Sequence, residues 1–162
     1  MRLITLLFLG FASAATAGEK VAFFGLTMLD DSLQGEVEGE DPAQATRLAM
    51  LEEIVRDRFA TEGYELLDIT PVQADLDRIV NPAKCYGCDT RMATDLGADF
   101  SLVGEVQKVS NLILAMNLQL RDAATGDLVR GGVVDIRSNT DESWQRGMRY
   151  ILKNRIFREE KK

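Results

Sequence analysis

The stretch FSLVGEVQKVSNLILAMNLQLRDAATGDLVRGGVVDIR, residues 100–137, decides the fold of this chain. It contains three apolar runs joined by short polar turns, a pattern typical of consecutive β-strands. In the middle run, apolar side chains alternate with smaller or more polar ones, so one face of that strand is expected to be buried. The apolar positions are Leu114, Met116, Leu118 and Leu120. Such a meander buries one face only where helices cover it, and the rest of the chain has the patterns to form them.

The other elements follow from apolar periodicity and from turn residues. We expect a strand at 21–29 covered on both faces, an exposed loop at 30–41, a helix at 41–63, a short strand at 64–69, a short helix from 70 to about 80, a helix near 89–96, the meander, and a final helix from about 141. In the turn at 122–127, Gly126 is placed to take a positive φ.

Helix starts are marked by residues that cap free backbone N–H groups. Asp41 is expected to cap the first helix, with Pro42 at its first position. Thr70 is expected to open a capping box for the short helix, and Asp141 or Ser143 to cap the last one. On that last helix the core-facing side chains are expected to be Trp144, Met148, Ile151 and Leu152.

The element order is therefore β-α-β-α-α-β-β-β-α, without repeats or linkers. It predicts one α/β (α+β) domain with helices packed on a mixed sheet. Crossover connections predict parallel pairing of the first strands, and the meander predicts antiparallel pairing of the last three.

Residues 1–17 have the features of a secretory signal peptide. A basic Arg2 precedes a short apolar run, and Ala15-Thr16-Ala17 fits the Ala-x-Ala pattern for cleavage after Ala17. We therefore expect a single periplasmic domain at 18–162, with no membrane insertion because no other apolar run reaches about 18 residues.

Charge and composition exclude several functions. The chain has 19 basic and 26 acidic residues, a net charge of −7, which is the wrong sign for binding nucleic acid. It contains no histidine, which excludes Ser-His and Cys-His nucleophile pairs and imidazole metal sites. We expect no catalytic residue, no cofactor and no enzymatic activity beyond what two cysteines allow.

Cys85 and Cys88 form a CxxC segment ahead of the helix near 89–96. Asp89 follows the second cysteine where covalent haem attachment needs histidine, so haem c is excluded. Three interpretations of the cysteine pair remain: a structural disulfide that closes a tight turn, a thiol-redox pair activated by the helix start, and a metal site shared with a second chain.

An acidic segment and a basic segment are further candidates. The acidic loop carries Asp30, Asp31, Glu36, Glu38 and Glu40, which would suit a hard cation, although it lacks EF-hand spacing and a solvated loop is the alternative. On the last helix a basic stripe, Arg146, Arg149 and Lys153, would suit docking of an acidic partner, with a solvated face as the alternative.

Two segments carry a family resemblance. CYGCD at residues 85–89 and SNLILAMNLQLRD at 110–122 resemble a proteobacterial family of exported proteins, a domain of unknown function with a CxGCD motif. The resemblance associates the chain with quinoprotein-dependent alcohol oxidation. The element order and the turn at 122–127 look like the small periplasmic α/β domains of the TolB amino-terminal, LpoB and CsgG type, which are mostly lipoproteins that bind protein partners.

These observations lead to three functional hypotheses. The first is a periplasmic accessory or binding protein that acts through a protein partner. The second is a thiol-disulfide redox protein that uses Cys85 and Cys88, and the third is a metal-ion binder that uses the acidic loop.

Overall fold

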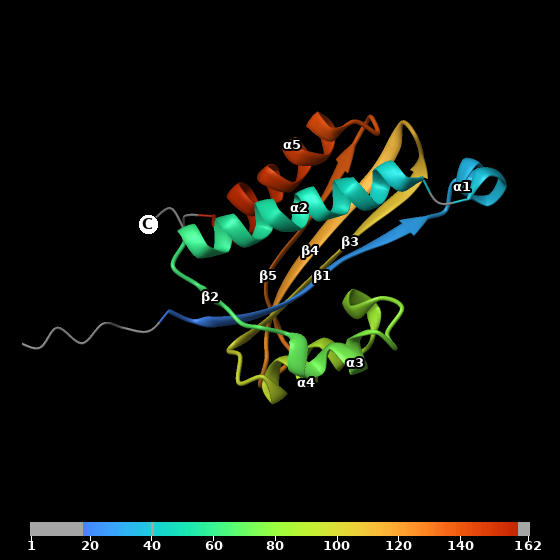
Figure 1. Ribbon diagram of the computed structural model, residues 1–162. Helices are drawn as coiled ribbons and strands as arrows, with labels where there is room; N and C mark the ends of the chain where they lie inside the picture. Colours follow the sequence, from blue (N-terminus) through green and yellow to red (C-terminus); the bar gives the residue numbers. More distant parts are fainter. Residues whose placement is uncertain (1–17, 40, 159–162) are drawn as a thin grey trace, which may run out of the picture.

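In the computed structural model, which describes residues 18–39 and 41–158, five strands form one mixed sheet in the order β2-β1-β3-β4-β5 (Figure 1). The strands are β1 Lys20–Asp30, β2 Glu65–Leu66, β3 Phe100–Ser110, β4 Ile113–Asp122 and β5 Leu128–Ile136. β1 is parallel to β2 and β3, whereas β3, β4 and β5 are antiparallel. The predicted fold class and both predicted pairing directions are confirmed. The expected signal peptide lies outside the described residues.

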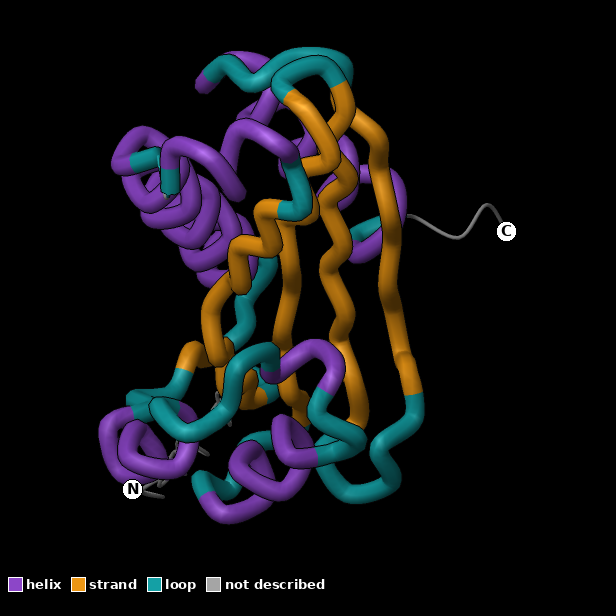
Figure 2. Tube along the Cα trace, turned by 90° about the vertical axis from the view of Figure 1, so that its right-hand side faces the viewer, coloured by secondary structure: helices purple, strands orange, loops and turns teal. Residues whose placement is uncertain are grey.

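The helices form two unequal layers on this sheet. They are α1 Leu33–Glu38, α2 Pro42–Thr61, α3 Gln73–Leu76, α4 Cys88–Asp95 and α5 Asp141–Ile151, with 3₁₀ turns η1 Thr70–Val72 and η2 Pro82–Lys84 and a π-helical turn η3 Leu152–Ile156. α2 and α5 run along one face, and α3 and α4 cover one end of the other (Figures 1 and 2). No helix in the described ranges is long and apolar enough to cross a membrane.

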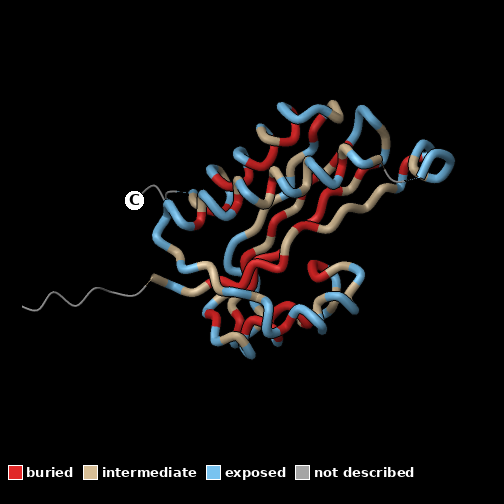
Figure 3. The backbone as a smooth tube through the Cα atoms, viewed as in Figure 1, coloured by how far each residue is buried: buried red, intermediate tan, exposed pale blue. Residues whose placement is uncertain are grey.

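The main core lies between the sheet and the α2–α5 layer (Figure 3). The four alternating residues predicted to be buried on β4 are at most 2% exposed. Trp144 and Met148 of α5 are fully buried against them, as predicted, and Leu51, Val55 and Phe59 supply the buried stripe of α2. Burial of such side chains contributes about 1.5–3 kcal/mol each, so this layer dominates the stability of the fold.

A smaller core lies on the opposite face, under α4 and the turns that precede it. Ala22 and Phe24 of β1 and Val103 of β3 pack there against Met92 and Ala93 of α4. The layer covers only one end of the sheet, so β1 is covered on both faces over part of its length rather than throughout (Figure 1).

Four local predictions are wrong. Residues 33–38 form a short helix instead of a loop, because Ser32 caps it by accepting a hydrogen bond from Gly35 N–H. The strand expected at 64–69 has two residues only. At η1 the side chain of Asp68, not that of Thr70, accepts a backbone hydrogen bond, from the Thr70 N–H. The helix that follows, α3, ends at Leu76. Thr140, not Asp141 or Ser143, caps α5.

A β-bulge in β1 links the sheet to α2. The register with β3 shifts between Phe23 and Leu26, and Gly25 within the bulge has φ +83°. The bulge turns Leu26 N–H away from the ladder, and this group donates to Glu52 Oε1 of α2 at 2.9 Å. A Cβ at Gly25 would lie 2.8 Å from that oxygen. The bulge therefore sets where α2 sits on the sheet.

The first prediction concerns this bulge. Gly25→Ala is expected to lower the free energy of unfolding by about 2–3 kcal/mol, because it combines a positive φ with a clash. Gly63→Ala is the matched control, because Gly63 also has a positive φ, +89°, but nothing lies within 4 Å of its Cβ position. This substitution should lower the free energy of unfolding by only about 1 kcal/mol. Denaturant unfolding measures both. Equal losses would show that the Glu52 contact does not constrain the bulge.

Candidate partner-binding site

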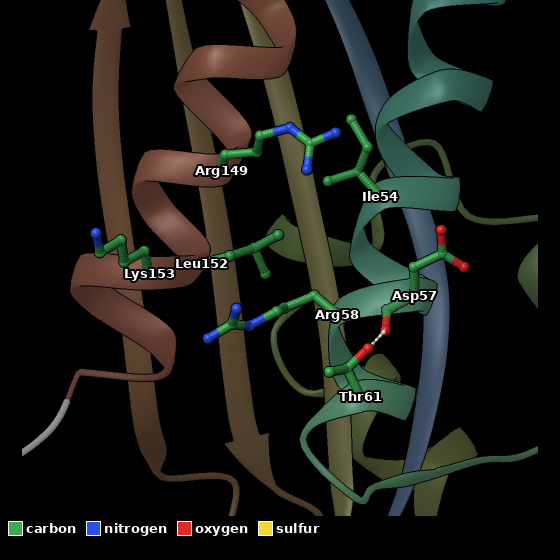
Figure 4. Close-up of a pocket in the computed structure, with 7 residues that line it drawn as sticks. All are labelled: Ile54, Asp57, Arg58, Thr61, Arg149, Leu152 and Lys153. Carbon is green, nitrogen blue, oxygen red and sulfur yellow. Dashed lines mark hydrogen bonds between the residues drawn. The ribbon is translucent and has the colours of Figure 1, made fainter.

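A groove of about 340 Å³ runs between α2 and the α5–η3 segment (Figure 4). Its lining residues are Ile54, Asp57, Arg58 and Thr61 from α2, Arg149 from α5, and Leu152 and Lys153 from η3. Ile54 and Leu152 give it an apolar floor, with Arg149 reaching in from α5 and Arg58 from α2. Lys153 also contributes to the lining, but its ammonium group points away from α2 (Figure 4). The groove thus presents two inward cationic side chains, and a third at its rim, beside a small apolar surface.

Arg58 is held in place from two sides. Its guanidinium lies 5.3 Å from the centroid of the Phe157 ring, and Nη2 binds Glu62 Oε1 at 2.5 Å. Its Nε is buried and has no hydrogen-bond partner among the described residues. A buried donor without a partner is uncommon in proteins, so this side chain is held by stacking and one ion pair rather than by a full set of hydrogen bonds.

The predicted basic stripe divides in the structure. Arg149 and Lys153 line the groove. Arg146 lies away from it, in a separate hollow beside β5, and its Nη1 is 3.6 Å from Glu142 Oε1. Arg58 was missed by sequence reasoning, because nothing in its own helix distinguishes it from Arg56. Only the packing of α2 beside α5 brings it to the other two cations.

The CYGC segment is closed by a Cys85–Cys88 disulfide, a bond that a structural bridge and an oxidised redox pair share. Cys88 is the first residue of α4 and is buried, while Cys85 is half-buried. Between them Tyr86 takes φ +56° and its side chain is fully exposed. The short covalent ring thus holds a backbone conformation that non-glycine residues rarely adopt.

Asp89 shapes the environment of the disulfide. It is 2% exposed, accepts a hydrogen bond from Ser101 Oγ at 2.8 Å, and lies 3.9 Å from Arg121 Nε. Its other oxygen is 3.9 Å from Cys85 Sγ. A buried carboxylate at this position opposes formation of a thiolate, which is the species that reacts in thiol exchange. The Cys88 N–H, at the start of α4, donates to Cys85 Sγ at 3.1 Å and acts in the opposite direction, because such a donor stabilises a thiolate.

The acidic segment is dispersed rather than gathered. Asp31 accepts a hydrogen bond from Gln107, and Glu36 and Glu38 lie on α1, where Glu38 accepts one from Gln34. Glu40 lies outside the described residues. Within the described ranges no three acidic or cysteine side chains are placed to hold a metal ion together.

Asp30 has partners of its own. Its carboxylate accepts hydrogen bonds from Ser32, from Gln44 at 2.9 Å and from Lys108 Nζ at 3.1 Å. Lys108 is only 2% exposed, so this ion pair is largely withdrawn from water. Burial raises the pKa of Asp30, but the hydrogen bonds from Ser32, Gln44 and Lys108 outweigh it and hold the pKa well below its ordinary range.

Residues 19–156 match the DUF3280 family, described as a protein of unknown function (DUF2380). The chain belongs to this family. The match confirms the predicted membership of a family of unknown function. No curated protein has a sequence that matches the chain.

Several solved structures are similar to this one. The LpoB C-terminal domain from Salmonella enterica is 19% identical with a TM-score of 0.49, covering 78% of this chain and 88% of that domain. Lipoprotein GNA1162 from Neisseria meningitidis is 14% identical with a TM-score of 0.48, covering 74% and 83%. A PelC dodecamer from Paraburkholderia phytofirmans is 15% identical with a TM-score of 0.45, covering 86% and 88%. These values are too low to transfer a partner or an assembly to this family member.

The disulfide generates the second prediction. Replacing both Cys85 and Cys88 with Ser should leave a folded domain and lower the free energy of unfolding by less than about 2 kcal/mol, because the ring closes very little chain. Denaturant unfolding followed by circular dichroism measures this, with reduced wild-type protein as the control. An unfolded variant would contradict it.

The third prediction uses the Asp30–Lys108 pair. Because the folded-state pKa of Asp30 is below its ordinary value, its contribution to stability is complete above about pH 4 and is lost as the pH falls further. Asp30→Asn should be less stable than wild type at pH 7, because it leaves Lys108 buried without its carboxylate. The difference between the two unfolding free energies should begin to shrink below about pH 4 and keep shrinking as the pH falls, because protons bind Asp30 in the unfolded chain before they bind it in the folded one.

The exposed Asp95→Asn variant is the control for loss of one carboxylate. The free energies of unfolding are measured from pH 7 downwards. If the values for wild type and Asp30→Asn stay parallel, the lowered pKa of Asp30 is contradicted.

Proposed function

We propose that this chain is an exported accessory protein that acts without catalysis, by binding an acidic segment of a protein partner in the groove between α2 and α5. The observation that carries the proposal is that Arg58 and Arg149 reach into one groove from opposite sides, with Lys153 at its rim, in a chain of net charge −7. A local cluster of the opposite sign on an acidic protein is an arrangement that attracts and orients a complementary partner.

The residues that line the groove indicate which kind of partner segment it would bind. Its floor is formed by Ile54 and Leu152, so an apolar side chain of the partner would be buried there between charged walls. Carboxylates on either side of that apolar residue would meet Arg149 on one wall and Arg58 on the other. Asp57, at the lip, disfavours a uniformly acidic ligand. The groove therefore suits a mixed apolar and acidic peptide segment rather than a free anion.

Two further observations support a binding role over catalysis. The chain has no histidine, and the carboxylate of Asp89 beside Cys85 opposes thiolate chemistry at the disulfide. Export rests on the signal-peptide pattern of residues 1–17. The family resemblance makes the dehydrogenases of quinoprotein-dependent alcohol oxidation the first partners to test.

The fourth prediction tests the groove in cells that export the protein. A photo-crosslinking benzoylphenylalanine in place of Thr61, at the lip of the groove, should form a discrete adduct with one protein. Reversing two charges, Arg149→Glu with Lys153→Glu, should reduce that adduct about tenfold or more, the equivalent of about 1.4 kcal/mol.

The matched control reverses two exposed charges on the opposite layer, Arg78→Glu with Arg91→Glu, and should leave the adduct unchanged. The proposal fails if the groove variant crosslinks as well as wild type, or if no adduct forms from Thr61.

A further inference from the structure

The outer edge of β5 is open. β5 is the last strand of the sheet and pairs on one side only, with β4 (Figure 2). Among the described residues, no hydrogen bond outside that ladder reaches the backbone of residues 131–136. Half of the backbone groups in this segment therefore point outward with only water to bind.

This edge carries its protection against strand pairing at its two ends only. Natural edge strands are shortened, bulged, covered, or carry charged side chains or Pro. β5 has nine residues and no Pro; a register shift with β4 and Arg130 lie at its start, and Asp135 lies near its end. The four residues between them, 131–134, carry no charge. Val133 is 58% exposed. The opposite edge of the sheet, β2, has only two residues. β5 is thus the longer edge of the sheet, and its middle is open to pairing.

A positive charge lies beside the edge on the face towards the helices. Gly132 is paired with Leu118, which faces the α2–α5 core. Arg155 of η3 lies over Gly132, where any Cβ would overlap its side chain. The exposed Arg155 therefore flanks the edge on that face. Val133 faces the other side, opposite Asn117.

We infer that β5 is a docking edge for an extended strand of another protein that carries carboxylates on its helix-side face. Backbone groups of the incoming strand would pair with the outward groups of residues 131–136, and an acidic side chain on its helix-side face would meet Arg155. A second copy of this chain is a poorer occupant. Two-fold pairing about Gly132 would bring the Arg155 side chains of both copies together, and like charges at that distance repel.

This surface is separate from the α2–α5 groove, and the inference stands whether or not the groove is occupied. Strand addition takes its affinity from the main chain and its specificity from alternate side chains. A peptide that alternates Thr with Glu supplies both features and is a suitable probe. A peptide that alternates Thr with Lys has the same backbone and the opposite charge.

The fifth prediction uses these two peptides, blocked at both ends and as long as β5. At about ten times its Kd, the Thr–Glu peptide should slow amide hydrogen exchange at alternate positions of residues 131–136 about tenfold. The Thr–Lys peptide should give no protection. Exchange is followed by NMR on the folded protein, so no variant is needed for this step.

Charge reversal then separates the edge from the rest of the surface. Arg155→Glu should abolish protection by the Thr–Glu peptide and permit it with the Thr–Lys peptide. Arg91→Glu, the same change on the opposite layer, should behave as wild type.

The inference is overturned if the Thr–Glu peptide gives no protection at about 1 mM, the weak limit of specific binding, or if both peptides protect equally. A concentration-dependent dimer that protects the same amides without peptide would overturn the choice of occupant in favour of a second copy.

Discussion

The packing of the β3–β4 hairpin against α2 and α5 is the constraint on which the rest of the structure depends. One face of β4 is buried beneath Trp144 and Met148, and Leu102 and Val106 of β3 join the same core. A shift of one residue in the register would turn every buried side chain of β4 to the opposite face. The register of the hairpin is therefore fixed by burial, and the positions of α2 and α5 follow from it.

The candidate surfaces arise where this packing stops. The groove lies between α2 and the α5–η3 segment over Ile54 and Leu152, and arginine side chains from both helices reach into it. The open edge forms because no element follows β5 in the sheet, while η3 returns to place Arg155 over Gly132. Both surfaces place cations at the border of the main core, on a chain whose net charge is negative.

The second layer is held by polar contacts as well as by apolar packing. Asp89 lies beneath the disulfide and binds Ser101 of β3, and Asn81 donates to Glu105 on the same strand at 2.7 Å. Lys84 also binds Glu105, at 3.0 Å. These contacts hold a short, loop-rich segment on the sheet beside the smaller apolar core. They fix the position of the disulfide relative to β3.

Sequence alone determined the four long strands, the pairing directions and the buried positions of β4 and α5, because periodicity records directly which side chains face a core. It overestimated the length of β2. It also located Arg149, Lys153 and the paired cysteines. It did not determine the α1 helix, whose six residues have no apolar period and depend on the Ser32 cap. Only the tertiary structure decided three placements: Arg58 at the groove, Arg155 over β5, and Asp30 beside Lys108. Each joins residues far apart in the chain, and the packing of whole elements, not local pattern, sets which of them meet.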